Sequence, residues 1–336
     1  MKMKKILIGF MCMILFMNVA WAAGVRQPNI RTHEQDFSII TVGSGAPGLL
    51  LSRAESMTVV QYKGNYFVVD CGSRTTANFL AAGLSFDKIE LLLFTHLHAD
   101  HTTDFANLML YRASFGGKEL EIDGPPHTVQ LYDFFRQFYR DDILYRAMVY
   151  NEETSVGTLT GVKVRELTGS NKFKFGGINI ETAEMIHTMY DLAYKFSADG
   201  KTIVVSGDTA YNENLINLAK NADILVMEGI GISDIVSKSA NTNVVNPDEY
   251  QQHKIDGETP KPLTKYAGDF TVESHASFDE LVDIAIQTNV KKLVITHISA
   301  KIKIDDAFMQ DVKKRFKDSG YNGEVILAKD GLEVNP

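Results

Sequence analysis

The stretch LLLFTHLHADHTTD, residues 91–104, constrains this chain more than any other. The chain has nine histidines in 336 residues, and three of them, His96, His98 and His101, lie within six residues together with Asp100. Imidazole and carboxylate groups are ligands that zinc and similar divalent ions accept. Four ligands in so short a loop exceed what one tetrahedral ion can take from it, so the spacing predicts two ions that share the loop.

Further residues of the ligand type follow later strands. An apolar run directly precedes His96, which places the loop at the carboxyl end of a predicted strand. His187 follows INIETAEMI, Asp208 ends TIVVSGD and His297 ends LVITH. Singly, each is more often an ordinary turn residue. As a set, they predict a metal site along one rim of the fold.

Short apolar strands alternate with helices along the chain. The strand-like runs of the first half include FSIITV, MTVVQYK, NYFVVD and IELLLFT, and those of the second include LAYKFSA, KTIVVSGD, DILVMEG, KKLVITH and EVILA. The turn Lys63-Gly64-Asn65 predicts a hairpin and favours mostly antiparallel pairing. Two halves of similar order predict an α/β (α+β type) fold in which two sheets pack face to face with helices outside, an αββα sandwich.

The N-terminus has the pattern of a secretory signal peptide, residues 1–22. MKMKK is a basic start, an apolar run follows from Ile6 to Val19, and Ala-Trp-Ala supplies a cleavage site before Ala23. The run is shorter than the roughly 20 residues that a spanning helix needs, so no stable membrane insertion is expected. The sequence therefore predicts a periplasmic or secreted protein with one domain, residues 23–336.

The charge of the chain argues against a polyanion as partner. The formal net charge is -8, and removal of the signal peptide deletes three lysines and no acid, which makes it -11. Nucleic-acid affinity depends largely on Lys and Arg side chains that neutralise phosphates. No nucleic-acid partner is therefore expected.

Two segments stand outside the sandwich pattern. Residues 236–272 are polar, contain three prolines and have no hydrophobic period, so they are either a surface loop or a lid over a site. The segment LYDFFRQFYRDDILYR, residues 131–146, has aromatic side chains at helical spacing. It is expected to pack either against the body of the protein or against a dimer partner, which leaves a homodimer open.

With these motifs the sequence resembles the metallo-β-lactamase superfamily, from about Phe37 to the C-terminus. The matching pieces are VVDCG, THLHADH, the lone His187, SGDT and THIS. The resemblance implies two divalent ions, with zinc as the default and manganese or iron as alternatives. It implies a first ion on His96, His98 and His187, a second on Asp100, His101 and His297, and Asp208 as the bridge between them.

Two details resemble the ribonuclease Z and arylsulfatase-like branch of this superfamily. A bridging Asp208 is typical of its phosphodiesterases and sulfatases, and ESHAS places His275 where the branch has a histidine that acts on the leaving group. The alternative for His275 is a residue at the start of the following helix, with Ser277 as the cap. The predicted catalytic residues are His275 and Asp100, and the implied reaction is hydrolysis by a hydroxide held between the ions.

Four other side chains have weaker predicted roles. Asp70, at the end of VVD, is expected to brace the ligand loop, and Glu228 either does the same or is a plain turn carboxylate. Tyr190 and Tyr211 each follow a predicted ligand by three residues. For both, ordinary packing is favoured over a place in the pocket.

Several features separate the chain from ribonuclease Z itself. The long arm that this family inserts between the positions of His187 and Asp208 is missing, because only residues 188–207 separate them. The expected export and the acidic charge also do not suit tRNA. The preferred hypothesis is therefore an exported hydrolase of a small-molecule sulfate or phosphate ester, arylsulfatase-like or a phosphodiesterase. The alternatives are a β-lactamase or lactonase, a tRNA 3′-processing endonuclease, and a metal-binding protein without turnover.

Overall fold

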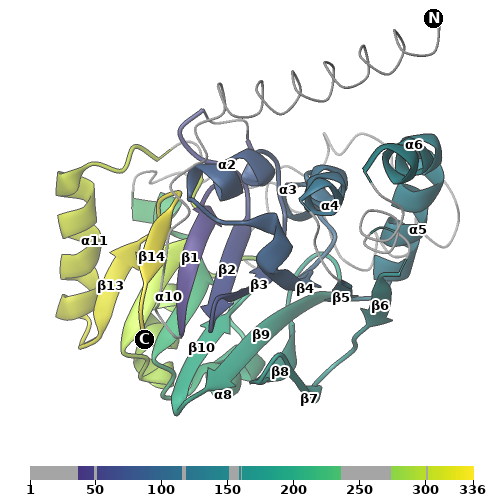
Figure 1. Ribbon diagram of the computed structural model, residues 1–336. Coiled ribbons are helices and arrows are strands. Elements are labelled where there is room, and N and C mark those ends of the chain that lie inside the picture. Colours follow the sequence, from purple (N-terminus) through teal and green to yellow (C-terminus); the bar gives the residue numbers. More distant parts are fainter. Residues whose placement is uncertain are drawn as a thin grey trace, which may run out of the picture. The chain divides into compact units, whose positions relative to one another are not determined.

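Two seven-stranded sheets form the centre of the protein (Figure 1). The structure is a computed structural model that describes residues 37–48, 51–115, 119–150, 159, 161–235, 274–299 and 302–336. The first sheet has the order β14 (Leu332–Val334), β1 (Phe37–Gly43), β2 (Met57–Tyr62), β3 (Asn65–Val69), β4 (Ile89–Leu93), β5 (Glu121–Gly124) and β6 (Lys163–Glu166). The second has the order β13 (Glu324–Leu327), β12 (Lys292–Thr296), β11 (Ile224–Glu228), β10 (Lys201–Val205), β9 (Asp191–Ala198), β8 (Ile178–Met185) and β7 (Lys172–Phe175).

The inner strands of each sheet are buried on both faces, which is why they read as nearly continuous apolar runs. In β3, for example, Tyr66 and Val68 join the core beneath the helices, whereas Phe67 and Val69 join the core between the sheets. Successive side chains of a strand point to opposite faces, so one strand serves two cores.

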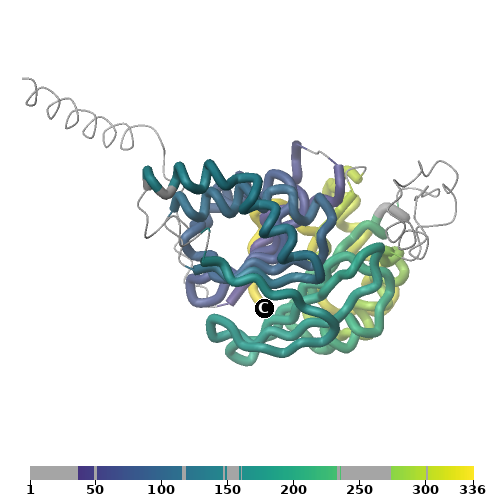
Figure 2. Tube along the Cα trace, turned by 90° about the vertical axis from the view of Figure 1, so that its right-hand side faces the viewer, coloured from purple at the N-terminus to yellow at the C-terminus, as the bar shows by residue number. Residues whose placement is uncertain are grey.

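Helices cover the outer face of each sheet (Figure 2). The first half of the chain contains α2 (Thr75–Ala81), the short η1 (Phe86–Lys88), α3 (Ala99–Thr102), α4 (Phe105–Ser114), α5 (Thr128–Phe138) and α6 (Arg140–Tyr150). The second contains α8 (Glu213–Ala219), the short η2 (Ile232–Ile235), α10 (Phe278–Thr288) and α11 (Asp306–Asp318). The predicted αββα sandwich is thus confirmed.

Among the described residues, no helix has both the length and the apolar character needed to cross a membrane.

The pairing of the strands differs in part from the prediction. The hairpin of β2 and β3 is confirmed, and Lys63 and Gly64 both have positive φ angles, as a two-residue type I′ turn requires. From β3 to β6, however, neighbouring strands run parallel, because helices cross over between them. Strands β10 to β13 are also parallel. Parallel strands end at a common edge, and both sheets bring their site-bearing loops to such an edge.

Two predicted segments lie outside the described residues. They are the signal peptide, residues 1–22, and the loop or lid, residues 236–272. The expectation of export therefore stays a prediction.

Candidate metal centre

The loop after β4 is fixed by the strand beside it. Asp70 follows β3 with a φ of 63° and accepts hydrogen bonds from the Thr95 backbone N–H (2.8 Å) and hydroxyl (2.9 Å). It also contacts the Nδ1 atom of His101 at 2.9 Å. Because β3 and β4 are parallel neighbours, their carboxyl ends place these groups side by side. Asp70 therefore braces the ligand loop, as predicted.

The structure brings six of the seven predicted ligands into two neighbouring groups of three. In the first group, the Nδ1 atom of His98 lies 2.9 Å from His96 Nε2 and 3.2 Å from His187 Nε2. The second group contains Asp100, His101 and His297. There, His297 Nε2 lies 3.0 Å from the Asp100 carboxylate and 3.3 Å from His101 Nε2.

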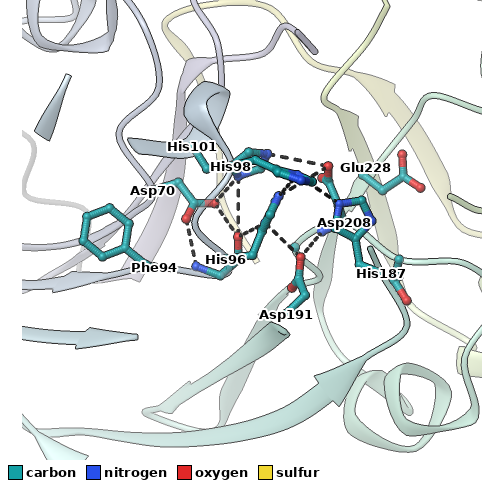
Figure 3. Close-up of polar contacts among 12 residues, drawn as sticks. Asp70, Phe94, His96, His98, His101, His187, Asp191, Asp208 and Glu228 are labelled. Carbon is teal, nitrogen blue, oxygen red and sulfur yellow. Dashed lines mark hydrogen bonds and ion pairs between the residues drawn. The ribbon is translucent and has the colours of Figure 1, made fainter. Parts of the chain in front are cut away.

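Asp208 lies between the two groups. Its Oδ2 atom is 4.0 Å from His96 Nε2, 3.6 Å from His101 Nε2 and 3.4 Å from His297 Nε2. Figure 3 shows Asp208 close to histidines of both groups. This placement suits a carboxylate that contacts two ions.

The geometry of the donor atoms fits divalent ions. Donor atoms bonded at about 2.0 to 2.1 Å to a tetrahedral zinc ion lie roughly 3.3 Å from one another. The nitrogen pairs within the two groups are 2.9 to 3.3 Å apart. Lone pairs that converge at such distances repel one another unless a cation or a proton lies between them. The residues present therefore fit a metal centre.

Outer contacts orient three of the histidines. His96 Nδ1 lies 2.9 Å from Asp191 Oδ2, His101 Nδ1 lies 2.9 Å from Asp70, and His187 Nδ1 donates to the Ser274 carbonyl at 2.9 Å. A partner at Nδ1 leaves the Nε2 lone pair free for an ion. Sequence reasoning missed Asp191, which stands at the start of β9 where it resembles an ordinary strand-end residue.

Burial and neighbouring charges prepare most of these side chains for an ion. Burial, followed by the neighbouring His101, lowers the pKa of His96 well below its usual value, and burial lowers the pKa of His187 to about 4. Burial alone would raise the pKa of Asp208, but His297 and His101 lower it more, so the carboxyl group is ionised. Neutral imidazoles and an ionised carboxylate are the forms that bind metal.

His101 leads to a prediction about protons. Burial lowers its pKa, but Asp208 and Asp70 outweigh burial, so the pKa of His101 in the metal-free protein lies well above its usual value. The imidazolium cannot bind an ion, so binding should release a proton, and metal affinity should increase as the pH rises through neutrality. Calorimetric titration in two buffers of different ionisation enthalpy measures this release. The same heat in both buffers would contradict the prediction.

His275 lies beside the metal groups and is paired with Glu228. Its ring centroid is 5.0 Å from that of His187, and its Nδ1 atom lies 3.5 Å from Glu228 Oε2, an ion-pair distance too long for a strong hydrogen bond. Burial lowers the pKa of His275, but Glu228 raises it more, to about 9. Glu228 also accepts from the backbone N–H of Ala276 at 3.1 Å. It therefore supports the His275 turn and is more than a plain turn carboxylate.

His275 fits both of its predicted locations, the start of a helix and the neighbourhood of the metal ligands. Ser277 caps α10 and forms a capping box with Glu280, as the alternative required. The same turn places His275 within 4.8 Å of donor atoms of His187 and Asp208. His275 is thus located both at the start of a helix and at the metal centre.

Tyr190 and Tyr211 have packing roles. The Tyr190 hydroxyl accepts from the Gly169 backbone N–H at 2.6 Å and donates to Glu184 at 2.8 Å. Tyr211 packs against the core beneath the second sheet, and its hydroxyl accepts from Gln287 at 2.7 Å. Ordinary packing, the favoured interpretation, is therefore confirmed for both.

A family model described as anti-Pycsar protein Apyc1 matches residues 37–237, more than half of the chain and most of this site. The chain belongs to the Apyc1 family. Ribonuclease Z of Borreliella burgdorferi (strain ZS7) is 24% identical over 319 residues, and the match covers 89% of this chain and 96% of that protein. Ribonuclease Z of Mycobacterium sp. (strain KMS) is 27% identical over 264 residues, and the match covers 77% of this chain and 83% of that protein.

Solved structures agree on the fold of this Apyc1-family chain. The metallo-β-lactamase fold protein YhfI from Bacillus subtilis matches with a TM-score of 0.61 and 19% identity, over 89% of this chain and 99% of that one. Human tRNase Z, short form, matches with a TM-score of 0.58 and 18% identity, over 89% of this chain and 98% of that one. The protein has the metallo-β-lactamase fold and is a metal-dependent hydrolase that acts on ester bonds. The His and Asp groups of the site can bind divalent metal.

The comparisons contradict the predicted substrate and partner. The preferred hypothesis of a hydrolase of small sulfate or phosphate esters with no nucleic-acid partner is wrong, because the sequence relatives named above are ribonucleases Z. The expectation of export is not affected by these comparisons. The metal ligands determine the type of reaction but are shared by enzymes with different substrates. The absence of one arm and the net charge were given too much weight, because neither describes the surface around the site.

Proposed function

We propose that the chain is a ribonuclease Z-type endonuclease that hydrolyses a phosphodiester bond at the 3′ side of a tRNA precursor, with two divalent ions, zinc by default. The observation that carries the proposal is the His275–Glu228 pair beside His187 and Asp208, in a chain with ribonucleases Z among its relatives. The similarity spans 96% of one such relative, so it extends well beyond the metal motif.

The residues of the site have distinct tasks in this reaction. When bound, the ions would lower the pKa of a water molecule to roughly 7 and neutralise charge on the phosphate oxygens. Holding the ions falls to the seven ligands described above. His275, kept as an imidazolium by Glu228, is placed to give a proton to the oxygen that leaves phosphorus.

RNA would reach the site without an arm between the metal ligands. The residues between His187 and Asp208 are all described, and they form the strands β9 and β10 and short connections. The phosphate contacts would come from some of the 34 Lys and Arg side chains of the chain. Binding should therefore weaken with added salt.

Cleavage of a defined RNA tests the proposal. We expect the zinc-loaded protein to cut a tRNA precursor once, at the junction with its 3′ trailer, and to leave the trailer-free tRNA intact, because the reaction is specific for that junction. Gel analysis of end-labelled RNA locates the cut. His275→Ala should lose the activity, and His127→Ala, at an exposed histidine outside the site, should keep it. A protein with two bound ions that cuts neither RNA, or both at many positions, contradicts the proposal.

A further inference from the structure

We propose that Asp191 is a positioning residue that fixes His96, a ligand of the first group, relative to Asp208, the carboxylate between the two groups. This inference rests on the proposed metal centre and not on RNA as the substrate. Asp191 is the first residue of β9 and its side chain is fully buried. No role in the reaction described above requires it, yet it contacts two of the predicted ligands.

One oxygen of Asp191 contacts two predicted ligands that belong to different sheets. Oδ2 lies 2.9 Å from Nδ1 of His96, which belongs to the loop after β4 in the first sheet. The backbone N–H of Asp208, after β10 in the second sheet, donates to the same atom at 3.1 Å. Figure 3 shows Asp191 beside His96 and close to Asp208. The carboxylate therefore links a ligand of the first group to the residue that lies between both groups.

The second oxygen of Asp191, Oδ1, indicates that a contribution to stability does not explain why a carboxylate is buried here. Among the described residues, Oδ1 of Asp191 has no hydrogen-bond partner although it is buried. A carboxylate oxygen that is buried without a hydrogen-bond partner costs free energy. A buried polar atom without a partner in a native site calls for an explanation, and here the contact with His96 supplies one.

The backbone nearby is shaped to admit this side chain. Gly207 has a φ of 64°, and a Cβ atom at this position would lie only 2.2 Å from Oδ1 of Asp191. Any larger residue at position 207 would push the carboxylate away from Asp208. The glycine of the SGDT motif therefore makes room for Asp191 as well as allowing the left-handed turn.

Asp70 offers a comparison within the same site. It contacts Nδ1 of His101 at 2.9 Å, but both of its oxygens also accept from Thr95 in its own sheet. Asp70 thus braces one histidine from within the first sheet. Asp191 differs because it reaches across from the second sheet, and its loss should disturb the position of His96 relative to Asp208.

Zinc binding without any RNA tests the inference. We expect Asp191→Ala to lower zinc affinity about 10- to 100-fold, as is typical when the partner of a metal-bound histidine is removed. Asp191→Asn, whose amide oxygen can still accept from His96 and Asp208, should lose less and so rescue part of the affinity. The matched control is Asp199→Asn. Asp199 is an exposed aspartate in the turn between β9 and β10, at the opposite end of β9 from Asp191, and this variant should bind zinc like the unchanged protein.

Two measurements separate positioning from general stability. Competition with a chromogenic chelator gives the affinity, and the visible spectrum of the cobalt-loaded protein reports the geometry of the ligands. Thermal unfolding of the metal-free variants should change little, whereas the increase in Tm on adding zinc should shrink.

Each outcome of this experiment is decisive. Unchanged affinity and an unchanged cobalt spectrum in both Asp191 variants would overturn the inference. An equal loss of Tm with and without zinc would also overturn it, because the role would then be structural. If Asp191→Ala does not fold, Asp191→Asn decides by the same criteria. Because no RNA is present, failure of RNA cleavage leaves this test unaffected.

Discussion

Asp208→Ala should abolish hydrolysis and reduce the number of tightly bound zinc ions from two to one or none. Oδ2 of Asp208 faces His96 of the first group and His101 and His297 of the second. An ion supplies several kcal/mol of charge stabilisation in such reactions, so we expect kcat/KM to fall by about 10³-fold or more. Elemental analysis of the dialysed protein counts the ions, and cleavage of the RNA precursor gives the rate.

Asp223→Ala is a matched control for this variant. Asp223 is also a buried carboxylate of the second sheet, but it precedes β11 at the opposite edge and pairs with Lys291 at 2.6 Å. Its loss should lower the Tm equally with and without zinc. Asp208→Ala should instead remove most of the increase in Tm that zinc produces, because bound metal stabilises the folded state. Two zinc ions and normal turnover in Asp208→Ala would refute the assignment.

Much of the fold could be predicted because the strands bury both faces and therefore appear as apolar runs. The same runs located His187, Asp208 and His297, since each lies within three residues of the end of its strand. The pattern does not record which strands pair, and the parallel run from β3 to β6 was accordingly missed. The three-residue strand β14, which pairs with β1 from the other end of the chain, was missed for the same reason.

The contacts that hold the ligands in place were harder to predict than the ligands. The spacing of HLHADH is a local property, whereas the contact between Asp191 and His96 joins two sheets and is absent from any short stretch. Glu228 was recognised as a candidate brace, but its contact with Ala276 joins residues 48 positions apart. The substrate was predicted wrongly because ligand types restrict the reaction and leave open the groups around the site that select a substrate.

His275→Ala should slow RNA cleavage about 10²- to 10⁴-fold, the usual contribution of a general acid. The size of the effect should depend on the leaving group. An RNA alkoxide needs a proton as it leaves, whereas the p-nitrophenolate of bis(p-nitrophenyl) phosphate is stable without one. The variant should therefore lose much less activity on this activated diester than on RNA, and single-turnover rates on both substrates measure the difference.

A second variant tests the source of the proton. Glu228→Gln removes the charge that raises the pKa of His275, so the pKa should fall and the proton should be lost at lower pH. The decline of kcat on the basic side should accordingly move to lower pH than in the unchanged protein. The competing role of His275 is that of a metal ligand, because it lies in one donor group with His187 and Asp208. Equal losses on both substrates in His275→Ala, together with a missing zinc ion, would establish that role and exclude the general acid.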